Sequence, residues 1–265
     1  MSAITLTDLN QCKARGEKIA VLTSYDASFT TRIEQAGAEV ILVGDSLGMV
    51  VQGHESTLPV TMDDMVYHCR NVARARARAF LIADMPFMSY ASPRQALDNA
   101  GRLMQEGFAH MVKLEGGRVQ IETVRRLAEH AIPVCAHLGL TPQSVHQLGG
   151  FRVQGRGSAA ARAILDDAVA LQCAGAQMLV LECVPGGLGK AVSERLDIPV
   201  IGIGAGPDCD GQVLVVYDLL GLSIGPTPRF VRNFLAAGGS VQQALDDYVA
   251  AVKSGDFPSA EESYP

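Results

Sequence analysis

Five acidic residues of the chain each lie one or two positions after the end of a short apolar run. These runs are too short for helices and too apolar for strands with one solvated face, so they predict strands buried on both sides of a parallel sheet. In parallel α/β folds the chemistry collects at the C-terminal ends of the strands, which would bring the acids to one mouth. The acids are Asp26, Asp45, Asp84, Glu115 and Glu182.

Carboxylates gathered in one mouth would raise one another's pKa unless a cation lay among them. Asp45, Asp84 and Glu115 follow three consecutive predicted strands, so we expect them to be neighbours. An all-carboxylate set without clustered His or Cys suits a hard ion such as Mg²⁺, which keeps waters and open positions for a substrate. The sequence therefore predicts a magnesium site at these three acids. For each acid alone, the alternative is a helix cap or a surface salt bridge.

Lys113 lies two residues before Glu115, so both side chains share one face of their strand. A lysine on that face is expected to bind an anionic substrate, the alternative being a structural ion pair with a neighbouring acid. Glu182 ends the sixth predicted strand, opposite the metal acids in a closed sheet, and is the candidate general base. His137 is either a core histidine bonded to the backbone or a polar group that lines the pocket.

The elements that would position these residues alternate regularly along the chain. Thr61 with Asp64, and the run Ser92-Pro93-Arg94-Gln95, are typical helix starts, while Gly37, Gly107 and Gly175 are expected to end helices. Ser158 is expected to cap a long helix. Terminal helices are predicted at 7–16, 229–237 and 241–254. The predicted strands are 19–25, 41–43, 79–83, 111–114, 134–138, 178–181, 199–203 and 213–217, the last of which could also be a helical turn.

Alternating strands and helices of this number predict a single (β/α)₈ barrel domain over residues 1–265, with a short N-terminal helix and C-terminal helices. An open doubly wound sheet is the alternative. A repeated spacing favours the barrel, because a glycine precedes Asp45 and Glu115 by eight residues and Glu182 by seven. The run Gly202, Gly204 and Gly206 is not a dinucleotide fingerprint, since too few residues follow it for a crossover helix.

Composition excludes several classes of protein. The net charge of -6 argues against a general nucleic-acid binder, and no apolar stretch reaches the roughly 20 residues of a membrane span. Six cysteines without a C-x-x-C pair, and without a secretory signal ahead of them, predict reduced thiols in the cytoplasm. The expected partners are therefore small molecules rather than nucleic acid or a membrane.

Several segments match one known family as a set, between Tyr25 and about Gly225: GDSLGMVVQGHESTLPVT, ADMPFMSY, MVKLEGG, HLGLTPQSV, VQGR, LVLECVP and IPVIGIGAG. In these segments the chain closely resembles the ketopantoate hydroxymethyltransferase (3-methyl-2-oxobutanoate hydroxymethyltransferase) family. The resemblance implies a barrel of the phosphoenolpyruvate/pyruvate type, Mg²⁺, and a homo-oligomer, in this family a decamer. The implied reaction transfers a hydroxymethyl group from 5,10-methylenetetrahydrofolate to 3-methyl-2-oxobutanoate. It gives 2-dehydropantoate through a Mg-stabilised enolate, in pantothenate (coenzyme A) biosynthesis.

The resemblance also implies a role for individual residues. Asp45 and Asp84 match metal ligands that contact the substrate, and Glu115 matches an acid at the metal. Ser46 and Lys113 match contacts to the ketoacid. By the same resemblance, Glu182 is the base.

Two departures and two alternative functions qualify this reading. Tyr217 stands where the family pattern has His, and Thr227-Pro228-Arg229 replaces a more usual Ile-Pro-Lys, both in the C-terminal region. A Mg-dependent carbon-carbon lyase acting on a 2-oxo or 2-hydroxy acid is one alternative, although the chain has no lyase-like Cys motif. A non-enzymic barrel that binds a sugar or an acid without turnover is the other.

Overall fold

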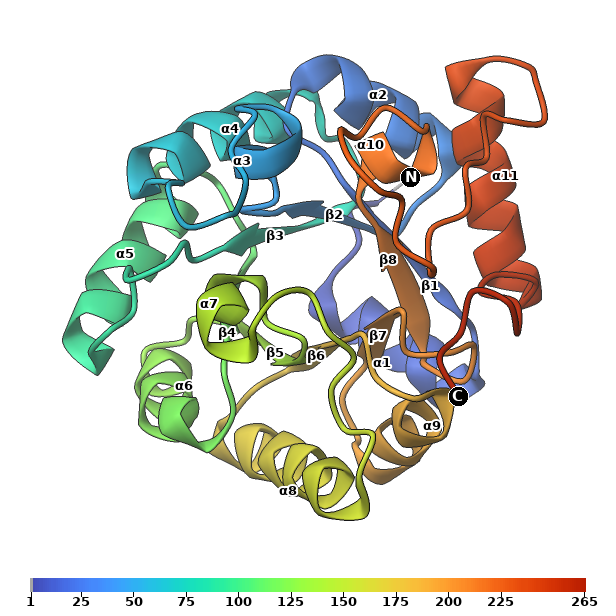
Figure 1. Ribbon diagram of the computed structural model, residues 1–265. Helices are drawn as coiled ribbons and strands as arrows, with labels where there is room; N and C mark the ends of the chain where they lie inside the picture. Colours follow the sequence, from blue (N-terminus) through green and yellow to red (C-terminus); the bar gives the residue numbers. More distant parts are fainter. Residues whose placement is uncertain (1) are drawn as a thin grey trace.

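The computed structural model describes residues 2–265, in which eight parallel strands form a closed barrel in chain order (Figure 1). The closed sheet confirms the predicted (β/α)₈ barrel and excludes the open doubly wound alternative. The strands are β1 (Ile19–Thr23), β2 (Val40–Val43), β3 (Phe80–Asp84), β4 (Met111–Glu115), β5 (Val134–Gly139), β6 (Met178–Glu182), β7 (Val200–Ile203) and β8 (Gly211–Leu214).

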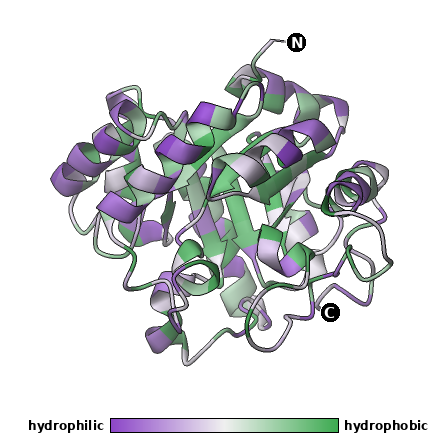
Figure 2. Ribbon diagram, turned by 90° about the horizontal axis from the view of Figure 1, so that it is seen from above, coloured by the Kyte–Doolittle hydropathy of each residue, from purple (hydrophilic) through white to green (hydrophobic). Residues whose placement is uncertain are grey.

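Helices surround the barrel and turn their hydrophilic faces outward, while the strands form the apolar centre (Figure 2). No helix within residues 2–265 is long and apolar enough to cross a bilayer. The helices are α1 (Leu6–Arg15), α2 (Ala27–Ala36), α3 (Leu47–Val50), α4 (Met62–Ala75), α5 (Pro93–Gln105), α6 (Ile121–Glu129), α7 (Val145–Leu148), α8 (Ser158–Ala174), α9 (Gly186–Arg195), α10 (Val216–Leu219) and α11 (Val241–Ser254), with 3-10 turns η1 (Arg118–Gln120) and η2 (Pro142–Ser144).

Most of the helix boundaries predicted from capping residues are confirmed. Thr61 and Ser92 are the N-caps of α4 and α5, and each side-chain oxygen accepts a hydrogen bond from a backbone N–H of the first turn. Gly37 and Gly175 follow α2 and α8 in the left-handed conformation, which glycine adopts without steric cost. These caps set the points at which the chain leaves each helix and enters the next strand.

Other helix predictions need correction. Segment 229–237 is not a helix, because the Asn233 side chain accepts hydrogen bonds from the backbone N–H groups of Leu235 and Ala236 and so competes with helical bonding. Gly157, not Ser158, is the N-cap of α8. The sequence does not predict α9, whose first four residues include three glycines that disfavour a helix. Segment 213–217 contains the end of β8 and the start of the helical turn α10.

The chain passes from β7 to β8 through a short turn without a helix, as the spacing after Gly206 requires. Strand β8 also pairs with β1, with Ile19 opposite Gly211, and this pairing closes the barrel. Helix α11 covers the junction between these two strands. The hydroxyl oxygen of Tyr248, a fully buried residue, lies 2.9 Å from the carbonyl oxygen of Val21 and 3.0 Å from that of Gln212.

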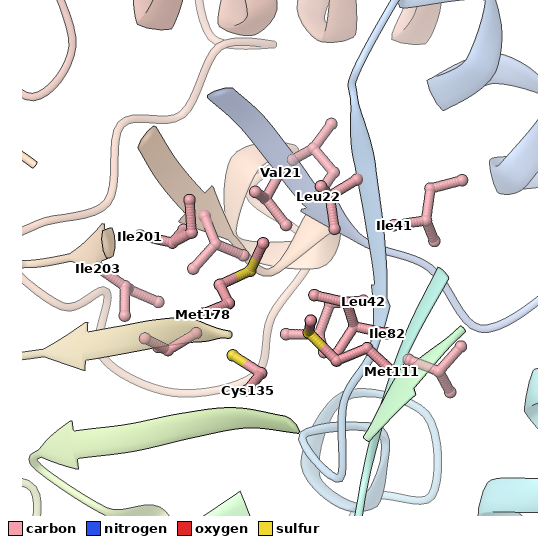
Figure 3. Close-up of a cluster of buried hydrophobic side chains, with 14 of the residues drawn as sticks. Val21, Leu22, Ile41, Leu42, Ile82, Met111, Cys135, Met178, Ile201 and Ile203 are labelled. Atoms are coloured by element: carbon pink, nitrogen blue, oxygen red, sulfur yellow. The ribbon is translucent and has the colours of Figure 1, made fainter. Parts of the chain in front are cut away.

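The inside of the barrel is apolar toward the N-terminal ends of the strands and charged toward the C-terminal ends. Leu42, Cys135 and Met178 belong to the apolar cluster shown in Figure 3. Side chains two positions apart on a strand share a face, so Met111, Lys113 and Glu115 form an inward row that changes from apolar to charged. The charged groups therefore lie above a layer that excludes water, and their mutual interactions are strong.

Candidate active site

A cavity of about 710 Å³ opens at the C-terminal ends of the strands. It brings together every residue that the sequence assigned to the site: Asp45, Ser46, Asp84, Lys113, Glu115 and Glu182. The fifth acid of the sequence pattern, Asp26, does not line the cavity. Its side chain caps α2 by accepting a hydrogen bond from the Phe29 N–H at 2.9 Å, so the helix-cap alternative holds for this residue.

The end of β2 lies very close to the end of β3. A Cβ atom on Gly44 would lie only 2.8 Å from Ser46 Oγ and 3.4 Å from Asp84 Oδ2, so a residue with a side chain would displace the Ser46 hydroxyl and touch the Asp84 carboxylate. This close approach lets the backbone N–H of Asp45 donate a hydrogen bond to Asp84 Oδ2 at 3.1 Å. Glycine at position 44 thus allows the two neighbouring acids to share one part of the cavity.

Lys113 pairs with Asp84 across adjacent strands, with 2.6 Å between Nζ and Oδ1. The structure therefore contains the ion pair that the sequence left open as the alternative, although Lys113 also lines the cavity. Burial by itself lowers the pKa of Lys113, but the carboxylates of Asp84, Glu115 and Asp45 outweigh this effect and raise the pKa above its ordinary value. The lysine is thus a permanent positive charge among the acids.

His137 lies between two acids, and the structure thereby resolves its role as a residue of the cavity wall. Its Nδ1 is 3.5 Å from Glu115 Oε1 and its Nε2 is 3.2 Å from Glu182 Oε2, although neither contact has the angles of a hydrogen bond. Burial and the Lys113 charge lower the pKa of His137, but the two carboxylates outweigh them and raise it to about 9. The imidazole is therefore positively charged at neutral pH.

The site has more negative than positive charge. Six carboxylates line the cavity, Glu55 and Asp218 in addition to the four acids above, against the two cations Lys113 and His137. Asp45 shows the consequence, because its burial and the neighbouring carboxylates of Asp84 and Glu115 raise the pKa of Asp45 well above the ordinary value. A divalent cation would balance the charge and keep Asp45 ionised.

The donor set also fits such an ion. Glu115 Oε1 is buried and accepts no hydrogen bond from the described chain, so it is an oxygen in need of a partner. However, within residues 2–265 no three His, Cys, Asp or Glu side chains are placed to hold one ion together. Mg²⁺ commonly binds through one or two carboxylates and retains several waters, so two direct aspartate ligands are enough. The three-acid metal site stays a prediction.

Glu182 ends β6, which lies opposite β2 in the closed barrel, as the sequence indicates. Its side chain is 13% exposed, against 4% for Asp84 and 3% for Glu115, so it is the most accessible of these three carboxyl groups. Gly139 is its partner on β5, where a Cβ atom would lie 2.1 Å from the Glu182 carbonyl oxygen. The Glu182 backbone is therefore held tightly while its carboxylate remains open to the cavity.

Ser46 lies beside Tyr25, with 2.8 Å between the two hydroxyl oxygens. Tyr25 is buried, and burial raises the pKa of its hydroxyl, which therefore stays protonated. Tyr217, one of the departures from the family pattern, packs with its ring centroid 5.9 Å from that of Tyr25. Thr227 and Pro228 line the outer part of the cavity. The departures thus lie around the entrance and behind Ser46 rather than among the acids.

Gln143 and Tyr90 are buried parts of the site whose roles the sequence did not indicate. The Gln143 side chain donates to Asp45 Oδ2 at 2.7 Å, and its backbone N–H donates to Glu115 Oε2 at 3.0 Å. The Tyr90 hydroxyl donates to Gln143 Oε1. Both residues belong to motifs that resemble a known family, but both lie in turns, where no periodicity shows which way a side chain points.

A family model described as ketopantoate hydroxymethyltransferase matches residues 3–260. The chain is 61% identical to a 3-methyl-2-oxobutanoate hydroxymethyltransferase of Nitrosococcus oceani over 100% of both chains. It is 60% identical to the protein of that name from Alkalilimnicola ehrlichii, covering 98% of this chain and 94% of the relative.

Solved structures with low sequence identity share the fold. Phosphonopyruvate hydrolase superposes with a TM-score of 0.62 at 14% identity, over 96% of this chain and 99% of that chain. A second structure of that enzyme, a complex with oxalate and Mg²⁺, gives 0.59 at 14% identity over 94% and 98% of the two chains. The 2,3-dimethylmalate lyase of the PEP mutase/isocitrate lyase superfamily gives 0.59 at 15% identity over 82% of each chain.

Proposed function

Because this chain belongs to the ketopantoate hydroxymethyltransferase family, we propose that it transfers the hydroxymethyl group of 5,10-methylenetetrahydrofolate to 3-methyl-2-oxobutanoate, giving 2-dehydropantoate for pantothenate biosynthesis. The relatives' names give the ketoacid and the transferase reaction. The observation that carries the proposal is a single cavity with two groups of residues. Asp45, Asp84 and Lys113 lie close together in it, and Glu182 presents a separate, accessible carboxylate.

Asp45 and Asp84 would hold a divalent cation such as Mg²⁺, with Glu115 beside it. When bound, the ion withdraws electron density from the keto oxygen of the substrate and stabilises negative charge that develops there. The charge balance of the site and the Glu115 Oε1 atom, which accepts no hydrogen bond from the described residues, support this assignment. The Mg²⁺ in the phosphonopyruvate hydrolase complex belongs to a protein that shares only the fold.

Glu182 would take the proton from C3 of the ketoacid, and the electron pair of that C–H bond would form the enolate. The enolate carbon would then bond to the one-carbon unit of the folate, water would supply the hydroxyl oxygen of the product, and the two carbon–nitrogen bonds that held this unit would break to release tetrahydrofolate. Glu182 can play this part because its carboxylate is open to the cavity and lies across the barrel from the paired acids.

Lys113 and Ser46 would hold the carboxylate of the ketoacid. The Lys113→Met variant keeps the length of the side chain but removes its charge, and a hydrogen bond to a charged group is worth about 1.5–3 kcal/mol. We expect the KM for the ketoacid to rise roughly tenfold or more, with a smaller change in the KM for the folate. Steady-state kinetics with each substrate varied in turn measure both values.

The matched control for this variant is Lys190→Met, which removes an exposed lysine from α9. It should leave both KM values unchanged. An equal rise in both KM values for Lys113→Met would instead assign Lys113 to the structural ion pair with Asp84 alone.

The test of the whole proposal is product formation by the purified protein from the ketoacid and 5,10-methylenetetrahydrofolate. Removal of divalent ions with a chelator should abolish turnover, and added Mg²⁺ should restore it. Cleavage of 2-hydroxy or 2-oxo acids without hydroxymethyl transfer would favour the lyase alternative. Binding of the ketoacid without any turnover would favour the non-enzymic barrel.

The proposal includes a homo-oligomer that works in the cytoplasm on small molecules, without nucleic acid or membrane as a partner. The resemblance to the family implies a decamer. Sedimentation analysis of the purified protein tests it directly. A monomer at micromolar concentration would contradict this part of the proposal.

A further inference from the structure

We propose that Gln143 is a positioning residue that holds the carboxylates of Asp45 and Glu115 in the arrangement a divalent cation requires. The inference rests on the proposed function. Gln143 lies in the turn η2 after β5, whereas Asp45 and Glu115 come from the ends of β2 and β4. A single residue outside these strands therefore contacts two of the three acids assigned to the ion.

The orientation of the Gln143 amide is fixed by its neighbours. The Met85 carbonyl oxygen can only accept, so the end of the amide that faces it must be the NH₂ group, and the Oε1 end accepts from the Tyr90 hydroxyl. The two hydrogens of the NH₂ group reach Asp45 Oδ2 at 2.7 Å and the Met85 carbonyl oxygen at 3.0 Å. Only one of the two orientations of the Gln143 amide therefore gives every polar atom of this buried side chain a hydrogen-bond partner.

The same network holds Glu115 from two directions. The Gln143 backbone N–H donates to Glu115 Oε2 at 3.0 Å, and the Glu115 backbone N–H donates to the Tyr90 hydroxyl oxygen at 3.3 Å. Tyr90 therefore connects the strand end that carries Glu115 with the amide that orients Asp45.

The hydrogen bonds from Gln143 occupy one carboxylate oxygen of Asp45 and one of Glu115, and they leave the second oxygen of each without a hydrogen bond from this residue. Within residues 2–265, neither Asp45 Oδ1 nor Glu115 Oε1 accepts a hydrogen bond. The amide is also neutral, so it fixes the direction of the carboxylates without cancelling the charge that attracts a cation. Lys113 acts differently, since its positive charge pairs with Asp84. Hydrogen-bonding partners of metal ligands typically change metal affinity by about 10- to 100-fold when they are removed.

The test uses the full chain, freed of metal, and a titration with Mn²⁺ in which free Mn²⁺ is followed by electron paramagnetic resonance. Gln143→Met keeps the length of the side chain and the backbone donor to Glu115, but loses the donor to Asp45. We expect the Mn²⁺ dissociation constant to rise roughly 10- to 100-fold. The control is Gln147→Met, which changes an exposed glutamine of α7 a few residues away and should leave the constant unchanged.

Tyr90→Phe provides a second variant that does not touch Gln143 itself. We expect a smaller rise in the dissociation constant, and a double variant only slightly weaker than Gln143→Met, because Tyr90 reaches the Asp45 carboxylate only through Gln143 and contacts Glu115 only at its backbone N–H. If Gln143→Met does not fold, Tyr90→Phe decides in the same titration. A Mn²⁺ dissociation constant within twofold of the wild-type value would overturn the inference. This criterion applies to Gln143→Met, or to Tyr90→Phe if Gln143→Met does not fold. Failure of the wild-type protein to bind Mn²⁺ would overturn the proposed metal site and the inference together.

Discussion

Glu182→Gln is expected to lose exchange of the C3 hydrogen of 3-methyl-2-oxobutanoate by about 10²- to 10⁴-fold, the usual contribution of a general base. Glutamine keeps the shape of the side chain but cannot accept the proton. Ketoacid binding should survive, because Asp45, Asp84 and Lys113 come from the ends of β2, β3 and β4 and do not depend on the Glu182 carboxylate. Product formation should fall in parallel with exchange, since the enolate precedes the new carbon-carbon bond.

The measurement is NMR of the ketoacid in deuterated water with Mg²⁺, with the folate either absent or added. Asp26→Asn is the matched control, because it makes the same acid-to-amide change at an acid that caps α2 outside the cavity, and asparagine is also a good N-cap. Exchange at the wild-type rate together with lost product would move Glu182 to the folate-dependent step.

Asp45→Asn is expected to abolish Mg²⁺-dependent turnover and, at the same time, to stabilise the metal-free protein. The pKa of Asp45 is raised in the folded state, so at neutral pH the ionised carboxylate costs stability. This cost is absent at low pH and grows as the pH rises from the ordinary pKa of Asp toward the raised one. Asparagine removes the charge and can still accept the hydrogen bond from Gln143.

Thermal melting with and without Mg²⁺ measures both effects. The wild-type protein should melt at a higher temperature when Mg²⁺ is added, whereas Asp45→Asn should melt higher than metal-free wild type and respond little to the ion. Full activity in Asp45→Asn would remove this residue from the metal site.

Asp84→Asn provides a contrast that only the structure predicts. Asp84 is the ion-pair partner of Lys113, and removing one member of a buried pair commonly costs about 3–5 kcal/mol because the other charge stays buried alone. Both variants should lose metal-dependent turnover, but only Asp84→Asn should lower the melting temperature of the metal-free protein. Equal shifts in the two variants would contradict the assigned pairing.

The features that the sequence predicts well are those carried by local patterns. Short apolar runs ending in an acid identify strand ends, and a parallel sheet then brings Asp45, Asp84 and Glu115 together. Period two along β4 places Lys113 in the same cavity. The partner of Lys113 depends on the register between two strands, with Lys113 opposite Asp84, and no local pattern sets that register.

The features that the sequence misses depend on contacts between distant segments. Gln143 reaches Asp45 because η2 folds back over the mouth, and the intervening chain gives no sign of it. The Asn233 side chain accepts backbone hydrogen bonds and so prevents the helix that the sequence pattern predicts. The glycines of α9 argue against a helix in the sequence, but packing against the barrel stabilises one. Family resemblance indicates which of these segments matter, but not which atoms meet.

The β1–β8 junction determines when a chain emerging from the ribosome can acquire its active-site cavity. Strands β1 to β7 can pair in the order in which they are synthesised, but the sheet keeps two open edges until Gly211 and its neighbours reach Ile19. Helix α11 is made later still, and its Tyr248 contacts both strands of the junction. A nascent chain therefore exposes the edge of β1 through most of translation, and this edge is the expected site for a chaperone to protect.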